Sequence, residues 1–194
     1  MTAANQSDPI LSCESKQAWA AWLAKHHQAP EGIWLRLAKK AADTPSVTYA
    51  EAIDVALCYG WIDGQKKPDN EHFWLQRFTC RSAKSLWSKI NRDKATKLIA
   101  NGQMKAAGLK EIKRAKSDGR WEAAYDSASS ATVPVDFQAA LDGNAKAKAF
   151  FATLNSANRY AMLFRIHTAK KAATRESRIQ TFVQMLEQHQ KIHP

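Results

Sequence analysis

The spacing of apolar residues predicts one helix and one strand within the first forty residues. Trp19 and Leu23 recur at helical spacing after Ser15, which predicts a capped helix that runs to about His27. Residues 33–38 alternate between apolar and polar side chains and predict a strand. The chain therefore starts with a helix followed by a strand.

A second helix and a hairpin are predicted to follow. Thr48 and Glu51 form a capping box, three residues apart, before an apolar helix that Gly60 ends. Residues 61–66 and 73–78 predict two further strands, joined by a turn that contains proline. Because a helix joins the strand at 33–38 to the next strand, we expect these two strands to be parallel, with a right-handed crossover.

No strand pattern follows residue 82, so the rest of the chain is predicted to be helical. The last predicted helix carries Ile179, Phe182, Val183 and Leu186 at positions i, i+3, i+4 and i+7, with Thr174 as its cap. The other helices are predicted at residues 85–100, 105–117, 135–142, 144–153 and 156–168.

These elements predict an α+β protein: a small mixed β-sheet of about three strands, one hairpin among them, packed by helices and followed by an all-helical C-terminal segment. Residues 126–134 are a polar stretch that ends in a proline and predict a linker. We therefore expect an α+β domain over residues 1–125, a linker over 126–134 and a helical segment over 135–194.

The charge is concentrated in one stretch of the sequence. The 194-residue chain has a formal net charge of +11, and residues 81–120 alone hold 12 basic and 3 acidic side chains. Such asymmetry indicates an anionic partner for that segment, either a small ligand or nucleic acid bound without sequence preference. A solvated helix face is the alternative interpretation.

Cysteine usage and the start of the sequence favour an intracellular protein. Cys13, Cys58 and Cys80 form no C-x-x-C pair and are odd in number, as expected of reduced thiols. The first residues contain neither a basic stretch nor an apolar run of the kind found in export signals. No stretch approaches the ~18 apolar residues of a membrane span. We expect a cytoplasmic protein without a membrane span.

Common catalytic and cofactor motifs are not found in this sequence. Gly102 and Gly108 are too far apart for a phosphate-binding loop, and no Gly-x-Ser-x-Gly or Ser-x-x-Lys occurs. His26, His27 and His72 have no ligands at metal-binding spacing. We therefore predict no cofactor and no metal, and the sequence leaves open whether the protein is an enzyme.

Residues 57–64 form the first candidate site, at a turn from helix to strand. Tyr59, Trp61 and Asp63 stand beside glycines that allow close backbone approach to a ligand. In the alternative interpretation, Gly60 ends a helix, Trp61 is a core residue and Asp63 caps a turn.

Residues 77–91 form the second candidate site, where a strand end precedes a helix start. Free N–H groups and the helix dipole favour anions at such a position, and arginines bind carboxylate or phosphate with two hydrogen bonds. We expect the two segments to line a common cleft, although the serines can simply cap the helix. The candidates in this segment are Arg77, Arg81, Ser85, Trp87, Ser88, Lys89 and Asn91.

Arg175 and Arg178 are the last candidates, at the start of the final helix. Arginine is poorly placed against the dipole there, so nearby carboxylates or a bound anion are expected to compensate. Asp63 and Asp69 are the expected partners, and the helix is then predicted to pack back on the α+β domain. Two solvated arginines are the alternative.

The motifs of these segments resemble the YdeI/OmpD-associated family, also called bacteriocin-protection proteins. The resemblance covers about residues 12–188, and Cys80 stands where the family has proline. The motifs that carry it are Ala56–Gly64, Arg77–Thr79, Ser85-x-Trp87-Ser88-Lys89-Ile90-Asn91, Gly102-x-Met104-x-x-x-Gly108, Ala115–Lys116, Gly119–Trp121, Ala169–Lys171, Thr174–Arg175 and Arg178–Ile179.

The resemblance implies a bacterial stress- or bacteriocin-protection protein that is associated with an outer-membrane porin and has no settled enzymatic activity. We therefore expect a binding module with an anion-favouring pocket, whose partner is a small anionic ligand or another protein. Two alternatives remain open. One is an enzyme on a small anionic substrate, with Asp63, Arg77, Arg81 and Ser85 at its site. The other is a nonspecific nucleic-acid-binding protein that uses residues 81–120.

Overall fold

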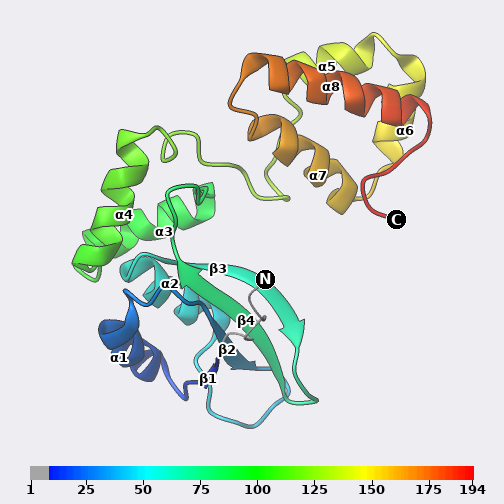
Figure 1. The fold of residues 1–194 in the computed structure, drawn as a ribbon. Coiled ribbons are helices and arrows are strands. Elements are labelled where there is room, and N and C mark those ends of the chain that lie inside the picture. The colour runs from blue at the N-terminus through cyan, green and yellow to red at the C-terminus, as the bar shows by residue number, and fades with distance from the viewer. Residues whose placement is uncertain (1–8) are drawn as a thin grey trace, which may run out of the picture. The chain divides into compact units, whose positions relative to one another are not determined.

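The computed structural model describes residues 9–194, which divide into two compact units (Figure 1). The first unit runs up to residue 87 and includes residues 91–123, and the second contains residues 88–90 and 124–194. The first is a mixed sheet with helices, and the second is entirely helical, so the fold is α+β as predicted. The expectation about an export signal concerns residues 1–8, which lie outside the described residues.

The sheet of the first unit has four strands in the order β1-β2-β4-β3. The hairpin of β3 and β4 is confirmed, although β3 extends through Pro68 and the turn lies at residues 69–72. Since β2 and β3 both run antiparallel to β4, they point the same way as expected, but β4 lies between them. The strands are β1 (Ile10–Ser12), β2 (Ile33–Ala38), β3 (Trp61–Pro68) and β4 (Phe73–Cys80).

Two helices cover one face of this sheet, α1 (Lys16–His26) and α2 (Tyr49–Cys58) (Figure 1). Trp19 of α1 is fully buried, and its ring lies 5.5 Å from that of Phe78 and 6.4 Å from that of Trp61. Each indole N–H of this tryptophan pair finds a backbone acceptor: Trp19 donates to Ala52 and Trp61 donates to His27. The pair therefore anchors both helices without leaving a buried donor unpaired.

The corner between α2 and β3 is set by local sequence. The predicted capping box is confirmed, since the Thr48 side chain accepts from the Glu51 amide and the Glu51 carboxylate accepts from the Thr48 amide. Gly60 has a φ of +76°, a left-handed conformation that favours glycine, and it ends the helix as expected.

Two more helices follow the sheet, α3 (Lys89–Ala100) and α4 (Ala106–Ser117). The sequence predicted a helix from residue 85, but residues 85–88 are a loop, which two arginines described below hold in place. α4 packs on the α2–β3 corner through Gly108, where a Cβ atom would lie 2.5 Å from the carbonyl oxygen of Cys58. Glycine is therefore required there for the close approach of two backbones.

The second unit packs four helices around one core. Asn144 and Asn155 cap the second and third of these helices, whereas the N-cap of the last is Lys171 rather than the predicted Thr174. The helices are α5 (Val135–Asp142), α6 (Ala145–Thr153), α7 (Ser156–His167) and α8 (Ala172–Glu187). Their shared core contains Phe137, Leu141, Ala147, Phe151, Leu154, Met162, Leu163, Ile166, Ile179, Phe182 and Leu186.

The apolar stripe of α8 is buried within this helical unit, because Ile179, Phe182 and Leu186 belong to its core. The prediction that the stripe packs on the α+β domain was therefore wrong. The carboxylate partners proposed for Arg175 were also wrong. Asp63 accepts from the Tyr49 hydroxyl and Asp69 pairs with Arg36, while Arg175 pairs with a carboxylate of its own unit.

None of the helices formed by residues 9–194 is both long and apolar enough to cross a membrane.

Candidate functional site

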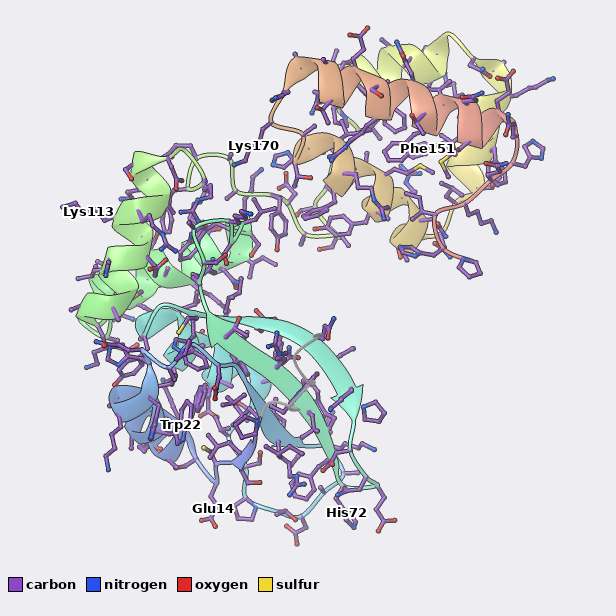
Figure 2. The ribbon with its side chains drawn as sticks, in the orientation of Figure 1. Glu14, Trp22, His72, Lys113, Phe151 and Lys170 are labelled. Atoms are coloured by element: carbon purple, nitrogen blue, oxygen red, sulfur yellow. The ribbon has the colours of Figure 1, made fainter. Side chains whose placement is uncertain are left out.

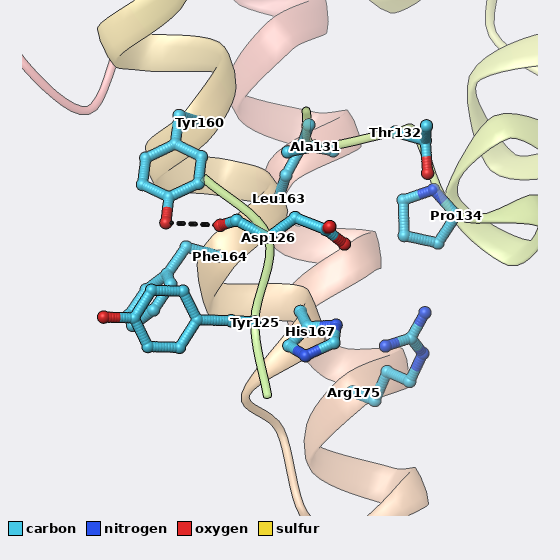
Figure 3. Close-up of a pocket in the computed structure, with 10 residues that line it drawn as sticks. All are labelled: Tyr125, Asp126, Ala131, Thr132, Pro134, Tyr160, Leu163, Phe164, His167 and Arg175. Carbon is cyan, nitrogen blue, oxygen red and sulfur yellow. Dashed lines mark hydrogen bonds between the residues drawn. The ribbon is translucent and has the colours of Figure 1, made fainter. Parts of the chain in front are cut away.

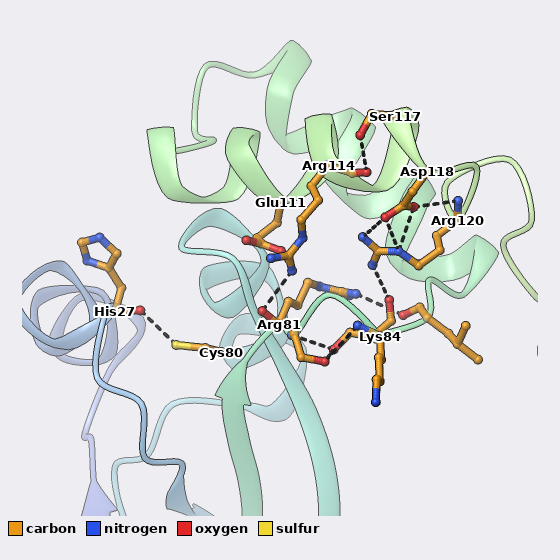
Figure 4. Close-up of polar contacts among 12 residues, drawn as sticks. His27, Cys80, Arg81, Lys84, Glu111, Arg114, Ser117, Asp118 and Arg120 are labelled. Atoms are coloured by element: carbon orange, nitrogen blue, oxygen red, sulfur yellow. Dashed lines mark hydrogen bonds and ion pairs between the residues drawn. The ribbon is translucent and has the colours of Figure 1, made fainter.

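Arg81 leaves the end of β4 and is buried with 5% of its surface exposed. Its guanidinium lies 3.6 Å from the centre of the Trp87 ring and donates to the carbonyl oxygen of Leu86 (Figure 4). A planar cation stacked on indole gains cation–π attraction that is strongest where water is excluded. Arg81 thus holds the loop that follows it.

Arg120 fastens the same loop from the other side. It is equally buried, donates to the Ser85 carbonyl oxygen at 2.7 Å, and is held by both carboxylate oxygens of Asp118 (Figure 4). The Ser85 hydroxyl accepts from the Ser82 amide, so it closes a turn and does not cap α3. The loop that the sequence assigned to a helix start is therefore shaped by two arginines, which explains why α3 begins only at residue 89.

Beside this loop lies a pocket of about 510 Å³ to which both predicted segments contribute. Tyr59 and Gly60 come from the first segment, and Cys80 and Arg81 from the second. The Cys80 thiol donates to the carbonyl oxygen of His27, and burial raises the pKa of this thiol (Figure 4). A thiol with a raised pKa is a poor nucleophile at neutral pH. The pocket is lined by His27, Gln28, Tyr59, Gly60, Cys80, Arg81, Ala106, Ala107, Lys110 and Glu111.

Ala106 and Ala107, in the amino-terminal turn of α4, line this pocket. The N-cap, Lys105, makes no side-chain hydrogen bond to the helix, and the first turn contains no acidic residue. Helix N–H groups without such a partner, together with the dipole, attract negative charge. The end of α4 is therefore an electropositive part of the pocket wall.

The charged side chains of the pocket strengthen this bias. Glu111 is paired with Arg114, three residues further along α4, so its charge is largely compensated. Lys110 is exposed at the pocket and makes no ion pair among the described residues. Arg81 contributes to the lining, but its guanidinium turns toward Leu86 (Figure 4). The positive side-chain charge at this pocket therefore comes from Lys110 rather than from Arg81.

Trp61, Asp63 and Arg77 do not line this pocket. Trp61 is a core residue, and Asp63 accepts a hydrogen bond of 2.7 Å from Tyr49. Asp63 is paired in register with Phe78, the strand neighbour of Arg77, and successive side chains of a strand point to opposite faces. The structure therefore places Asp63 and Arg77 on opposite faces of the sheet.

The remaining candidates are dispersed as well. The backbone of Ser88 forms an isolated β-bridge with that of Tyr125. The Lys89 ammonium lies 2.8 Å from the carboxylate of Asp126. Asn91 lies in the first turns of α3 and is half-buried. In α8, Arg178 donates to the carbonyl oxygen of Arg165.

Arg175 lines a second pocket, of about 240 Å³, within the helical unit (Figure 3). Sequence reasoning missed the other residues of this pocket, and the aromatic and His residues at 160, 164 and 167 at helical spacing were the available signal. The lining comprises Tyr125, Asp126, Ala131, Thr132, Pro134, Tyr160, Leu163, Phe164, His167 and Arg175.

Sequence reasoning also missed Lys110, Glu111, His27 and Gln28 of the first pocket. They meet there because α4 packs on the α2–β3 corner at Gly108, and the G-x-M-x-x-x-G motif was the signal for that contact. Within residues 9–194, no three His, Cys, Asp or Glu side chains cluster as metal ligands would.

Two family models match separate ranges of the chain. Residues 11–111 match the model of a domain of unknown function (DUF8412), and residues 130–189 match that of the bacteriocin-protection, YdeI or OmpD-associated family. The chain therefore belongs to the family of the first model, and its residues 130–189 match the bacteriocin-protection, YdeI or OmpD-associated model. The named family thus matches the helical unit, a shorter range than the resemblance over residues 12–188 indicated. No curated protein and no solved structure matches the chain.

Proposed function

We propose that this protein, whose residues 130–189 match the YdeI or OmpD-associated family, is a binding module that takes up a small anion at the amino-terminal end of α4. The observation that carries the proposal is the position of this helix end. It forms part of the wall of a pocket whose one carboxylate, Glu111, is already paired with Arg114. Lys110 supplies a cation at the same place.

The groups around the pocket suit a carboxylate or phosphate ligand. The backbone N–H groups of Ala106 and Ala107 and the Lys110 ammonium are donors, and Gln28 adds a neutral amide. A charge-assisted hydrogen bond contributes about 1.5–3 kcal/mol, and the helix dipole adds about 0.3–1 kcal/mol. A volume of about 510 Å³ lies within the range of small-molecule sites.

In this proposal, ligand binding is the molecular basis of a protective role. The description of the family at residues 130–189 names bacteriocin protection, and we extend that role to this chain. An enzyme acting through Asp63, Arg77, Arg81 and Ser85 has less support, because these side chains face different surroundings.

Calorimetric titration with inorganic phosphate tests the proposal. Lys110→Ala removes the pocket cation and should weaken binding roughly tenfold, since 1.4 kcal/mol corresponds to one decade in affinity. Lys113→Ala is the matched control, because Lys113 is exposed on the same helix but does not line the pocket (Figure 2). Equal affinity in all three proteins, or no binding to the wild type, would overturn the proposal.

A second candidate function is nonspecific binding of a polyanion such as nucleic acid. All three acidic residues between 81 and 120 pair with arginines: Asp93 with Arg92, Glu111 with Arg114 and Asp118 with Arg120. Lys110 and Lys113 lie on the side of α4 opposite the buried Gly108 and Ile112, and two further exposed lysines, Lys105 and Lys116, stand just before the helix and in its last turn. This lysine face consists of Lys105, Lys110, Lys113 and Lys116.

The two candidates differ in which lysines matter. Each phosphate contact on a polyanion contributes to the salt dependence of binding by a similar amount, so Lys110→Ala and Lys113→Ala should weaken DNA binding alike. Gel shifts at increasing salt measure this. Binding that survives high salt, or that prefers one sequence, would exclude the nonspecific mode.

A further inference from the structure

The pocket of the helical unit is walled by aromatic rings (Figure 3). The Tyr125 and Phe164 rings meet edge to face with their centres 4.9 Å apart, and the Tyr160 ring lies 5.9 Å from Phe164. The Tyr160 hydroxyl donates to the carbonyl oxygen of Asp126 at 2.9 Å, which fixes the orientation of this ring. Three rings from two segments thus line one cavity.

Asp126 is the one acidic residue that lines the same cavity (Figure 3). Lys89 lies 2.8 Å from the Asp126 carboxylate, but the two side chains are 45% and 27% exposed. Ion pairs that are this open to solvent contribute little free energy. A ligand cation can therefore take the place of Lys89 at the carboxylate at small cost.

The cation on the rim of the pocket is already neutralised. Arg175 donates from Nε and Nη2 to the two oxygens of the Asp136 carboxylate, and from Nη1 to the Ile166 carbonyl oxygen. Because this guanidinium is shared with a carboxylate and a carbonyl group, it is poorly available to a ligand anion and repels a ligand cation only weakly.

We infer that this pocket binds a small organic ammonium group, held by the rings of Tyr125, Tyr160 and Phe164 and by the Asp126 carboxylate. Aromatic rings around a cation attract it through their negative faces, and quaternary ammonium ligands are recognised in this way. The cavity of about 240 Å³ is small, so the ligand is of choline size rather than larger. This site is separate from the anion site proposed at α4, and neither depends on the other.

Titration of the full chain with choline, followed by calorimetry and by NMR, tests the inference. We expect saturable binding with a dissociation constant on the order of 1 mM, as suits so small a ligand. The control ligand is 3,3-dimethyl-1-butanol (dimethylbutanol below). Carbon replaces the quaternary nitrogen of choline in this compound, so it has the same shape without the charge. It should bind at least about tenfold more weakly, a loss of about 1.4 kcal/mol.

Two matched substitutions separate the contribution of the ring from that of the hydroxyl. Tyr160→Phe keeps the π surface and should keep choline binding within about twofold, whereas Tyr160→Leu should weaken it about tenfold. Asp126→Asn should also weaken it. Glu176→Gln is the control, because Glu176 is exposed in α8 and does not line the pocket.

Three results would overturn the inference. Dimethylbutanol could bind as tightly as choline, or Tyr160→Leu could bind choline with the affinity of the wild type. The third is that acetate binds in this pocket and choline does not. Thermal melting of each variant shows whether the helical unit remains folded. If Tyr160→Leu unfolds, the choline affinity of Asp126→Asn is compared with that of the wild type instead, and equal affinities would overturn the inference.

Discussion

Arg175 of α8 holds both carboxylate oxygens of Asp136 in α5, at 2.6 Å from Nε and 2.8 Å from Nη2. The pair joins α5 to α8, across 39 residues of sequence, within the range that matches the family. The hydrogen bond from Arg175 holds the pKa of Asp136 below its ordinary value. The stability of the helical unit should therefore depend on pH in a defined direction.

Asp136→Asn should destabilise the protein by about 1 kcal/mol or less, because the pair is partly exposed. The folded-state pKa is depressed, so the native state binds fewer protons and the stability from this pair is complete above the unfolded pKa of about 4. This stabilisation is lost as the pH falls through the folded-state pKa of Asp136, which is the lower of the two pKa values. Thermal melts should thus show a gap between wild type and variant that is constant above about pH 5 and closes below about pH 4. A gap that widens in acid would contradict this assignment.

The sequence predicted a carboxylate or an anion beside Arg175, with two solvated arginines as the alternative, and it named Asp63 and Asp69 rather than Asp136 as partners. A helix stripe such as Ile179 and Phe182 predicts burial without naming the surface that buries it. Asp136 is the first acidic residue of α5, and only the folding of α5 onto α8 brings it close. Long-range pairing of this kind depends on helix packing, which local periodicity does not encode.

Gly108→Ala should destabilise the first unit by about 1–3 kcal/mol, the range for overpacking. Its Cβ would lie 2.5 Å from the Cys58 carbonyl oxygen and 2.7 Å from that of Leu57, and backbone atoms cannot step aside as side chains do. Urea unfolding measures the loss. Gly143→Ala is the control, because a Cβ there would have 3.5 Å of clearance, so it should change stability by less than about 1 kcal/mol.

Phe182→Ala should lower the stability of the helical unit by about 3–5 kcal/mol, since it removes a buried ring from the core. We also propose that the two units fold as separate domains, with the chain passing from the first to the second after residue 123. Calorimetry should then show two transitions, of which Phe182→Ala shifts one and Leu35→Ala, in the sheet, shifts the other. A single transition shifted by both variants would argue against separate domains.

Arg81→Lys should destabilise the first unit by roughly 1–3 kcal/mol despite keeping the charge. Lysine has no planar group to stack on Trp87 and cannot donate to Leu86 with the same geometry. Lys84→Ala, an exposed change in the same loop, should have little effect. Urea unfolding followed by tryptophan fluorescence compares them, and equal stability of Arg81→Lys and wild type would show that stacking contributes nothing.

Arg81 also shows where sequence reasoning about the site reached its limit. The sequence predicted a common cleft for residues 57–64 and 77–91, and of these Tyr59, Gly60, Cys80 and Arg81 line one pocket. The sequence could not show that the arginine turns inward to Trp87, because a residue type does not reveal the direction of its side chain. Strand β1 was missed for a similar reason, since its three residues are too few to show a period.

NMR of the intact 21.7 kDa chain during titration with inorganic phosphate tests the anion site most directly. The account predicts that the backbone amide signals of Ala106, Ala107 and Lys110 move first and saturate together, and that Lys110→Ala abolishes or strongly weakens these shifts. Shifts confined to Lys113 and Lys116, or to the helical unit, would contradict it.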